Sequence, residues 1–408
     1  MNDSFIPFHR PSIGEEEIGE VTDTLRSGWL TTGPRTARFE REFRDYTAAS
    51  HSVALNSATA ALHLALAALE IGPGDEVITT PMTFCATVQA ILHVGAVPVL
   101  ADIGSDGNID PNEIERRITP RTRAIIPVHI AGLPCDMDAI WAIARAHNLH
   151  VIEDAAHAAG TKIGDRPVGA DPGESGGSDA VAFSFYATKN LTTGEGGMLT
   201  THRQALADSV RTLSLHGTSH DAWDRYSDRG DWHYDVLAHG FKYNLSDIHA
   251  ALGIHQLHKL DGFIERRTAI AGMYHRALAG LDELELPPDR PGCRHSWHLY
   301  IPRLRVENLR VNRAEFIREL RQRGIGTSVH FIPIPLHPFF AQLPLARYEC
   351  PHAIDLYPRI LSLPLYPALS DEQVDSVARC VRDVLESSRR KKHVPGAQLE
   401  PLPLCAAE

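Results

Sequence analysis

The sequence is poor in the features that mark secreted, membrane or nucleic-acid-binding proteins. Its six cysteines are scattered and include no CxxC pair, a pattern more typical of reduced thiols than of a disulfide framework. No apolar run approaches the roughly 20 residues that span a bilayer, and the polar N-terminus lacks the pattern of a signal peptide. The net charge of −11 argues against nucleic acid as a main partner. We therefore expect a cytoplasmic protein that binds neither membranes nor nucleic acids.

Lysine is also scarce, with six residues in the whole chain. Four of them lie in a polar helical stretch, a loop or a basic tail, which leaves Lys189 and Lys242. Only Lys189 follows an apolar run, residues 180–185, and precedes a glycine-rich turn, residues 194–197. Burial at the end of a strand disfavours the ammonium form, and a neutral amine can form a Schiff base with an aldehyde. A solvated loop lysine is an equally good interpretation of this local sequence.

The chain is long enough for more than one domain, and its periodicity predicts an α/β protein. Its 408 residues exceed a typical single domain. Short apolar runs alternate with helical patterns in the first half, which favours a mostly parallel sheet. Farther on, long helices alternate with residues 298–306 and 325–331, which we predict to be strands of a smaller unit. We expect a large α/β domain over residues 1–265, a small α+β domain over 266–388 and a disordered tail over 389–408.

Three further stretches carry residue types suited to a flat, phosphorylated cofactor. Ser57, Ala58 and Thr59 open a helix, where free N–H groups bind anions. Phe84 stands at a strand-to-helix junction, where its ring could stack on a cofactor. Asp154 ends a predicted buried strand, at the sheet edge where ligands bind, and could pair with a protonated ring nitrogen. Taken singly, they are equally compatible with an ordinary N-cap, a core aromatic and a helix-capping acid.

Two other features of the sequence bear on function. His249, His255 and His258 lie on one predicted helix, but their spacing is not HExxH, so we expect no metal site. Residues 216–240 are polar and form a predicted long loop, and loops of this length often serve as lids or binding loops.

In their order along the chain, these stretches resemble the fold type I aminotransferases, which use pyridoxal 5′-phosphate. More narrowly, the chain resembles the DegT/StrS-type nucleotide-sugar aminotransferases, from Phe8 to about Leu385. The resemblance is carried by SGWLTTGP from Ser27, NSATAALH from Asn56, GDEVITTPMTF from Gly74, AIIPVHIAG from Ala124, VIEDAAHAAGT from Val151, FSFYATKN from Phe183, EGG from Glu195, FKYNLSDI from Phe241, HSWHLY from His295, IGTSVHF from Ile325 and LSLPLYP from Leu361. Within that family, it is most similar to the enzymes that make UDP-4-amino-4-deoxy-L-arabinose for lipid A modification in lipopolysaccharide.

The resemblance implies roles for individual residues. Lys189 would join covalently to the cofactor and shuttle protons, and Asp154 would keep the pyridine nitrogen protonated. The other implied cofactor contacts are Ala58, Thr59 and Ser184 at the phosphate, Phe84 stacked on the ring and His157 beside it. Asn244 would reach the phosphate of the neighbouring subunit's cofactor, which implies a homodimer with shared active sites. Trp29, Thr31 and His330 would face the sugar substrate.

The implied reaction is transfer of an amino group from L-glutamate to a keto-sugar nucleotide, at the C4 ketone of a UDP-sugar. Alternative acceptors are 3-keto or 4-keto dTDP- and GDP-hexoses. A related sugar dehydratase or aromatising synthase would use the same scaffold, but the dehydratases of this kind replace the lysine with histidine, so Lys189 favours transamination. A non-catalytic pyridoxal-binding regulator is disfavoured by the acidic balance and by the lack of a DNA-reading motif.

Overall fold

The computed structural model describes residues 5–173, 176–219 and 233–390. Its centre is a seven-stranded sheet with the strand order β1-β9-β8-β5-β4-β2-β3. The strands are β1 (His51–Leu55), β2 (Glu76–Thr79), β3 (Val97–Leu100), β4 (Thr122–Ile126), β5 (His150–Asp154), β8 (Ala180–Ser184) and β9 (Gly197–Thr201). Among these seven, β9 alone runs antiparallel to its neighbours, so the sheet is mostly parallel, as predicted.

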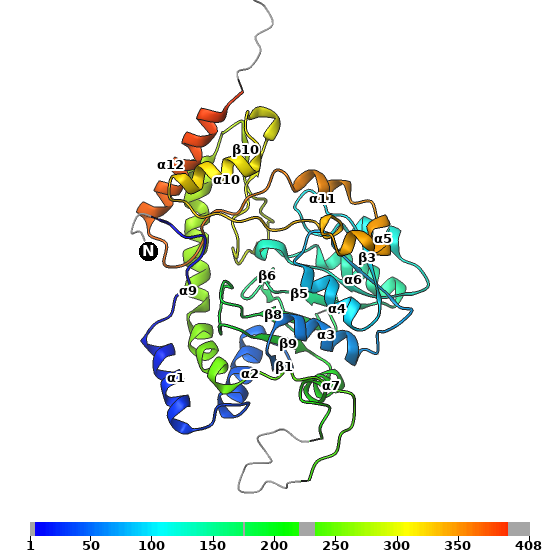
Figure 1. The fold of residues 1–408 in the computed structure, drawn as a ribbon. Coiled ribbons are helices and arrows are strands. Elements are labelled where there is room, and N and C mark those ends of the chain that lie inside the picture. The colour runs from blue at the N-terminus through cyan, green and yellow to red at the C-terminus, as the bar shows by residue number, and fades with distance from the viewer. Residues whose placement is uncertain (1–4, 174–175, 220–232, 391–408) are drawn as a thin grey trace, which may run out of the picture.

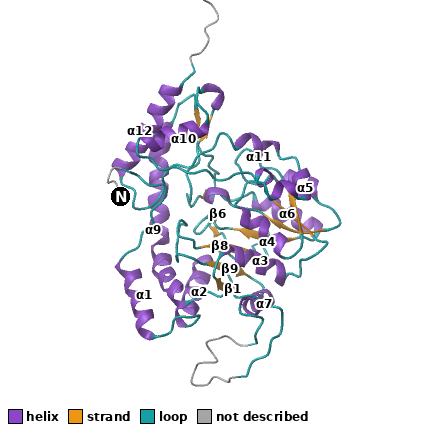
Figure 2. Cartoon of the chain, viewed as in Figure 1, coloured by secondary structure: helices purple, strands orange, loops and turns teal. Residues whose placement is uncertain are grey.

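Helices cover both faces of the sheet (Figure 1, Figure 2). They are α1 (Glu15–Ser27), α2 (Pro34–Thr47), α3 (Ala58–Ala68), α4 (Cys85–His93), α5 (Pro111–Arg117), α6 (Met137–His147), α7 (Gln204–Ser214) and α9 (Asp247–Leu278). All five residues of β8 are buried, as expected for a strand that is covered on both sides. Val181 and Phe183 of β8 pack in one core with α2 and α9, whereas Ala180 and Ala182 pack in another with α3 and α7.

The long helix α9 connects the sheet to a further hydrophobic core, which it forms with α10 (Arg313–Gln322) and α12 (Asp371–Ser388). Its first half packs against α1 and α2, and its second half packs with α10 and α12. Figure 1 shows α9 running from the level of α2 to the level of α12. The proposed boundary after residue 265 falls inside α9, so the two proposed domains share one continuous helix.

The prediction of long strands in the second unit was wrong over most of their length. In the described residues, only β12 (Arg303–Leu304) forms within 298–306, paired with β10 (Leu284–Glu285). Residues 325–331 form single bridges, between Ile6 and Ile325 and between Ser328 and Ser362. Their apolar pattern reflects burial between the two cores rather than pairing in a sheet. Short elements elsewhere are β6 (Lys162–Ile163), β7 (Arg166–Pro167), β11 (Cys293–Arg294) and α11 (Pro351–Leu356).

Two sequence predictions fall partly outside the described residues. The tail predicted over 389–408 lies outside them from residue 391 onward, and the long loop predicted over 216–240 lies outside them at residues 220–232. In the described ranges, no helix is both long and apolar enough to cross a bilayer. Within the same ranges, no group of three or more His, Cys, Asp or Glu side chains is arranged to hold a metal ion.

Asp247, the first residue of α9, caps the distant helix α2. That helix begins after Gly33, which has no side chain to accept its first N–H groups. Instead, Asp247 Oδ2 accepts from the N–H of Arg35 at 3.0 Å, and Oδ1 accepts from the N–H of Thr36 at 2.9 Å and from its hydroxyl at 2.7 Å. The carboxylate is fully buried, and hydrogen bonds to a charged acceptor are stronger than neutral ones. This contact therefore fixes the start of α2 against the start of α9.

Replacing Asp247 tests how much this capping contact contributes to stability. We expect Asp247→Ala to lower the free energy of unfolding by about 2–3 kcal/mol, because it removes an N-cap and leaves buried donors unpaired. Asp247→Asn keeps the volume and one acceptor oxygen, so its loss should be smaller. Urea unfolding followed by circular dichroism measures both. Equal stability of the alanine variant and the unsubstituted protein would contradict the capping role.

Candidate active site

A cavity of about 650 Å³ opens at the carboxyl ends of the central strands, the edge at which α/β proteins bind their ligands. Its volume is typical of a small-molecule site. The predicted site residues that line it are Ala58, Thr59, Phe84, Asp154, His157, Ser184, Lys189 and His330. The structure thus brings together residues from five separate stretches of the chain, each at or shortly after the end of a secondary-structure element or in the 325–331 segment.

Lys189 lies in the turn that follows β8. Its backbone N–H donates to Tyr186 O at 2.9 Å, which closes the turn, and its side chain lines the cavity. Burial lowers the pKa of the Lys189 amine from 10.5 to about 8, although the charge of Asp154 acts in the opposite direction. The amine is therefore neutral in a substantial fraction of molecules near physiological pH, as a nucleophile requires. This environment excludes the alternative of a solvated loop lysine.

Asp154 ends β5 and is 5% exposed. Its Oδ2 accepts from the hydroxyl of Thr87 at 2.8 Å, and its Oδ1 accepts from the N–H of Ala156 at 3.2 Å. Burial raises the pKa of this carboxyl, whereas the two hydrogen bonds and the charges of Lys189 and His129 lower it. A cationic partner in the cavity would favour the ionised form further.

The start of α3 supplies an anion site. Ser57 is the N-cap and accepts from the N–H of Ala60 at 3.1 Å. The first N–H groups of a helix, here those of Ala58 and Thr59, have no acceptor within the helix. Gly197 packs directly behind this turn, where a Cβ would lie 2.6 Å from the backbone nitrogen of Ala58. The glycine therefore allows β9 to approach closely enough to hold the turn at the cavity wall.

Aromatic and imidazole rings form the remaining walls. Phe84 is 60% exposed, so a face of its ring is available to a ligand. The N–H of Ala131 donates to His157 Nδ1 at 3.3 Å, which places the proton of a neutral His157 on Nε2. Burial, followed by the charge of Lys189, holds the pKa of His157 well below its usual range. His330 is fixed by a 2.8 Å contact between Nδ1 and Ser362 Oγ and by stacking on Phe8.

Three predicted site residues do not line this cavity. Asn244 Nδ2 donates to Thr32 Oγ1 at 2.7 Å, and Trp29 Nε1 donates to Thr32 O at 3.1 Å. Thr31 O accepts from the N–H of Asp247 at 3.1 Å. Trp29, Thr31 and Asn244 thus form one cluster where the segment before α2 meets the segment before α9. We call it the 29–32/244 cluster.

The sequence interpretation gave no role to several residues that line the cavity. The clearest are Thr87, His298 and Phe331. His298 was quoted within the HSWHLY motif, but its position depends on contacts that local sequence does not reveal. Its ring lies 4.3 Å from that of His157, centroid to centroid, and its Nδ1 contacts Asn190 Oδ1 at 3.2 Å. Thr87 lies in the first turn of α4, three residues after Phe84, but nothing in the local sequence marks its hydroxyl as a partner of Asp154.

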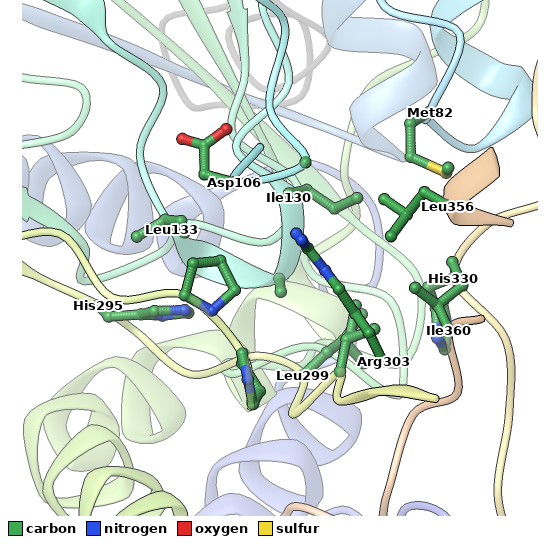
Figure 3. Close-up of a pocket in the computed structure, with 15 residues that line it drawn as sticks. Met82, Asp106, Ile130, Leu133, His295, Leu299, Arg303, His330, Leu356 and Ile360 are labelled. Atoms are coloured by element: carbon green, nitrogen blue, oxygen red, sulfur yellow. The ribbon is translucent and has the colours of Figure 1, made fainter. Parts of the chain in front are cut away.

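A second pocket shares His330 with the larger cavity, and Figure 3 shows the residues that line it. Its walls include Met82, Ile130 and Ile360, which pack in one hydrophobic cluster, together with Leu299 and Arg303. Its volume is about 40 Å³, which holds one or two water molecules. This pocket is too small for a cofactor or a sugar, so the larger cavity is the candidate active site.

The larger cavity has a donor set that fits pyridoxal phosphate. A buried amine can bond to the aldehyde, a buried carboxylate can pair with the ring nitrogen, and a helix N-terminus can hold the phosphate. Lys189, Asp154 and the Ala58–Thr59 turn supply these three groups from different strand ends. An exposed aromatic face, that of Phe84, is available for the flat ring.

Comparison with known proteins finds similarity to aminotransferases along most of the chain. Residues 11–382 match the model of the DegT/DnrJ/EryC1/StrS aminotransferase family. The chain is 51% identical over 387 residues to the spore coat polysaccharide biosynthesis protein SpsC of Bacillus subtilis (strain 168), which covers 94% of this chain and 98% of SpsC.

Solved structures resemble the whole fold. Spr1654 from Streptococcus pneumoniae, assigned as a sugar aminotransferase and solved in a PLP-form, matches with a TM-score of 0.84 and 37% identity, over 94% of this chain and 99% of that chain. PseC from Helicobacter pylori, an aminotransferase involved in the biosynthesis of pseudoaminic acid, matches with a TM-score of 0.86 and 29% identity, over 94% of this chain and 100% of that chain.

The low pKa of Lys189 predicts selective reaction with an aldehyde. With pyridoxal phosphate and borohydride, the labelling rate of Lys189 should rise with pH around a midpoint near 8, because only the neutral amine attacks. Peptide mass spectrometry at a series of pH values measures this rate. Lys259 is an internal control, since its hydrogen bonds to Glu17 and Glu16 outweigh burial and raise its pKa. Labelling of Lys189 that begins only near pH 10 would contradict the assigned environment.

Proposed function

The chain belongs to the DegT/DnrJ/EryC1/StrS aminotransferase family and is a pyridoxal phosphate-dependent sugar aminotransferase, and we propose that it transfers an amino group from L-glutamate to the C4 ketone of a UDP-sugar. The observation that carries the proposal is the placement of the Lys189 amine and the Asp154 carboxylate in one cavity, beside the anion-binding start of α3. The cavity volume of about 650 Å³ leaves room for a sugar beside a cofactor.

The chain's own residues account for the catalytic groups that transamination needs. Pyridoxal phosphate, when bound, supplies an electron sink that stabilises negative charge at the carbon bearing the amino group. Lys189 Nζ would remove the proton from the α-carbon of glutamate as general base and deliver it, as general acid, to the carbon that had been the cofactor's aldehyde. Asp154 would hold a proton on the ring nitrogen. Ala58, Thr59 and Ser184 would bind the phosphate, and Phe84 and His157 would orient the ring.

The acceptor assignment rests on the sequence motifs and on the kinds of relatives. SpsC is named for spore coat polysaccharide biosynthesis, and PseC for the biosynthesis of pseudoaminic acid. Amino sugars destined for surface polysaccharides, lipopolysaccharide included, are thus the proposed product class, and the likeness to the arabinose-type enzymes supports the UDP and C4 assignments. His330, on the cavity wall, is the proposed sugar contact within the same chain. The described cysteines are free thiols, which supports the proposed cytoplasmic location.

We further propose that two copies of the chain share their active sites. The 29–32/244 cluster carries residue types expected at the cofactor phosphate and the sugar, yet it lies outside the cavity of its own chain. Lys242 Nζ donates to Asn244 Oδ1 at 2.6 Å, so a cation accompanies this cluster. In a homodimer with two-fold symmetry, each cluster would complete the partner's cavity. Trp29, Thr31 and Asn244 are accordingly proposed to act in trans.

A panel of keto-sugar nucleotides tests the reaction. With L-glutamate as donor, we expect kcat/KM to be higher on a 4-keto UDP-sugar than on 3-keto UDP-sugars or on dTDP- or GDP-linked keto-sugars. Amino sugar and 2-oxoglutarate should form in equal amounts. Lys189→Ala should lower turnover by roughly 10³-fold or more, because it removes both proton transfers. Lys162→Ala removes a lysine away from the cavity and is the matched control. Turnover in Lys189→Ala within tenfold of the control would refute the catalytic assignment, and ammonia release without an amino sugar would indicate a dehydratase instead.

Mixing two inactive variants tests the shared sites. Lys189→Ala and Asn244→Ala should each have low activity alone. In a hybrid dimer, both lesions fall in one site and the other site is intact, so random mixing should restore activity to about a quarter of the sites. Activity of the mixture, measured after subunit exchange, provides the readout. No recovery despite demonstrated exchange would show that Asn244 serves the cavity of its own chain.

A further inference from the structure

Two threonine hydroxyls form a buried chain that ends on Asp154. Thr87 Oγ1 lies 2.8 Å from Asp154 Oδ2, and Thr83 Oγ1 lies 2.8 Å from Thr87 Oγ1. Thr87 is completely buried, and Thr83 and Asp154 are 2% and 5% exposed. Thr83 lies in the turn that leads into α4 and Thr87 lies in the first turn of that helix, and both line the active-site cavity. The two hydroxyls therefore link this turn to the carboxylate proposed to face the ring nitrogen.

The chemistry of these groups fixes the direction of the hydrogen bonds. An ionised carboxylate only accepts hydrogen bonds, and a threonine hydroxyl has one proton to donate. When Asp154 is ionised, Thr87 must donate to it, so Thr83 must donate to Thr87. When Asp154 is protonated, Thr87 can accept from it and donate to Phe84 O, which lies 3.3 Å away. The hydroxyl pair can thus serve both protonation states, but its charge-assisted arrangement is the one that points toward Asp154.

The remaining contacts of Asp154 complete a fixed geometry. Its Oδ1 accepts from the N–H of Ala156 at 3.2 Å, so each oxygen has one protein donor. The backbone of Asp154 is tied to the neighbouring segment, where its N–H donates to Pro127 O at 2.9 Å and its O accepts from the N–H of His129 at 3.2 Å. Rotation of the carboxylate would break at least one of the two side-chain hydrogen bonds.

We propose that Thr87 is a positioning residue for the transamination: its hydroxyl, polarised by Thr83, holds the ionised carboxylate of Asp154 in the orientation that pairs with the ring nitrogen of the cofactor. The inference rests on the role of Asp154 in the proposed function. The same turn presents the Phe84 ring to the cavity, so the start of α4 controls both the face and the nitrogen edge of the cofactor ring. A purely structural role would limit Thr87 to its contact with Phe84 O at the helix start.

Binding and spectroscopy of the cofactor separate these two roles. Thr87→Val replaces the hydroxyl with a methyl group of similar size and leaves Asp154 Oδ2 without its donor. We expect the Kd for pyridoxal phosphate to rise about tenfold, the absorption maximum of the bound cofactor to shift, and kcat to fall roughly ten- to a hundredfold, since hydrogen bonds to charged groups are strong. Because the Thr87 hydroxyl is completely buried against Asp154, we expect KM for the keto-sugar nucleotide to stay within about twofold. Thr87→Ser, which keeps the hydroxyl, should restore the spectrum and most of the affinity.

Two reference variants make the result decisive. Thr200→Val is the matched control, because the Thr200 hydroxyl is buried and donates only to a backbone oxygen, that of Gly169 at 3.1 Å. It should leave cofactor affinity and spectrum unchanged. Asp154→Asn should lose affinity and shift the spectrum at least as much as Thr87→Val.

The outcomes distinguish this inference from the proposed function. If Asp154→Asn changes the cofactor and Thr87→Val behaves as Thr200→Val does, Thr87 has no positioning role. If Asp154→Asn itself matches the unsubstituted enzyme, the role of Asp154 fails and the inference fails with it. If Thr87→Val does not fold, Thr83→Val tests the inference in its place. Removing the Thr83 hydroxyl should change the cofactor spectrum in the same direction but by less. An unchanged spectrum in Thr83→Val would then refute the proposed positioning of Asp154 by the two hydroxyls.

Discussion

The site depends on holding an amine and a carboxylate together in one cavity, where the surrounding protein desolvates both. Desolvation disfavours both charged forms, while the attraction between Lys189 and Asp154 favours them. The balance lowers the pKa of the lysine and raises that of the aspartate. The ionisation of each group therefore depends on the charge of what binds between them. The sheet makes this arrangement possible, because β5 and β8 are parallel neighbours that end at the same edge.

The other groups around the cavity keep that balance from being disturbed. Burial holds the pKa of His157 and of His298 well below the usual range and lowers that of His330 to about 4. These imidazoles are therefore neutral near pH 7 and offer hydrogen bonds without adding positive charge next to Lys189. In the proposed function, the charge of a phosphorylated cofactor would be met instead by backbone N–H groups at the start of α3. Neutral hydrogen-bonding groups and the proposed anion site thus lie in different parts of the cavity.

The sheet and the core formed by α9, α10 and α12 are joined rigidly beside the site. Helix α9 passes from one core into the other without a break, and Arg267 near its middle is buried and donates to the carbonyls of Trp297, His298 and Leu365. These bonds hold the segment that carries His298 against the helix. At its other end, α9 begins with the Asp247 contact to α2, next to the 29–32/244 cluster. One helix therefore sets the position of a cavity wall and of the cluster proposed to serve the partner.

Local sequence was sufficient to predict the mostly parallel sheet and the residues that end its strands. Lys189, Asp154 and the Ser57–Thr59 turn could be identified because an apolar run followed by small or polar residues marks a strand end, and strand ends of a parallel sheet share an edge. The family motifs added Ser184, His157 and His330. Only the tertiary structure determined that Asp247 caps α2, that Thr87 binds Asp154 and that His298 enters the cavity, since these contacts join residues far apart in the chain and leave no periodic trace. The same holds for residues 298–306 and 325–331, whose apolar pattern records burial between two cores, because burial alone does not specify pairing into strands.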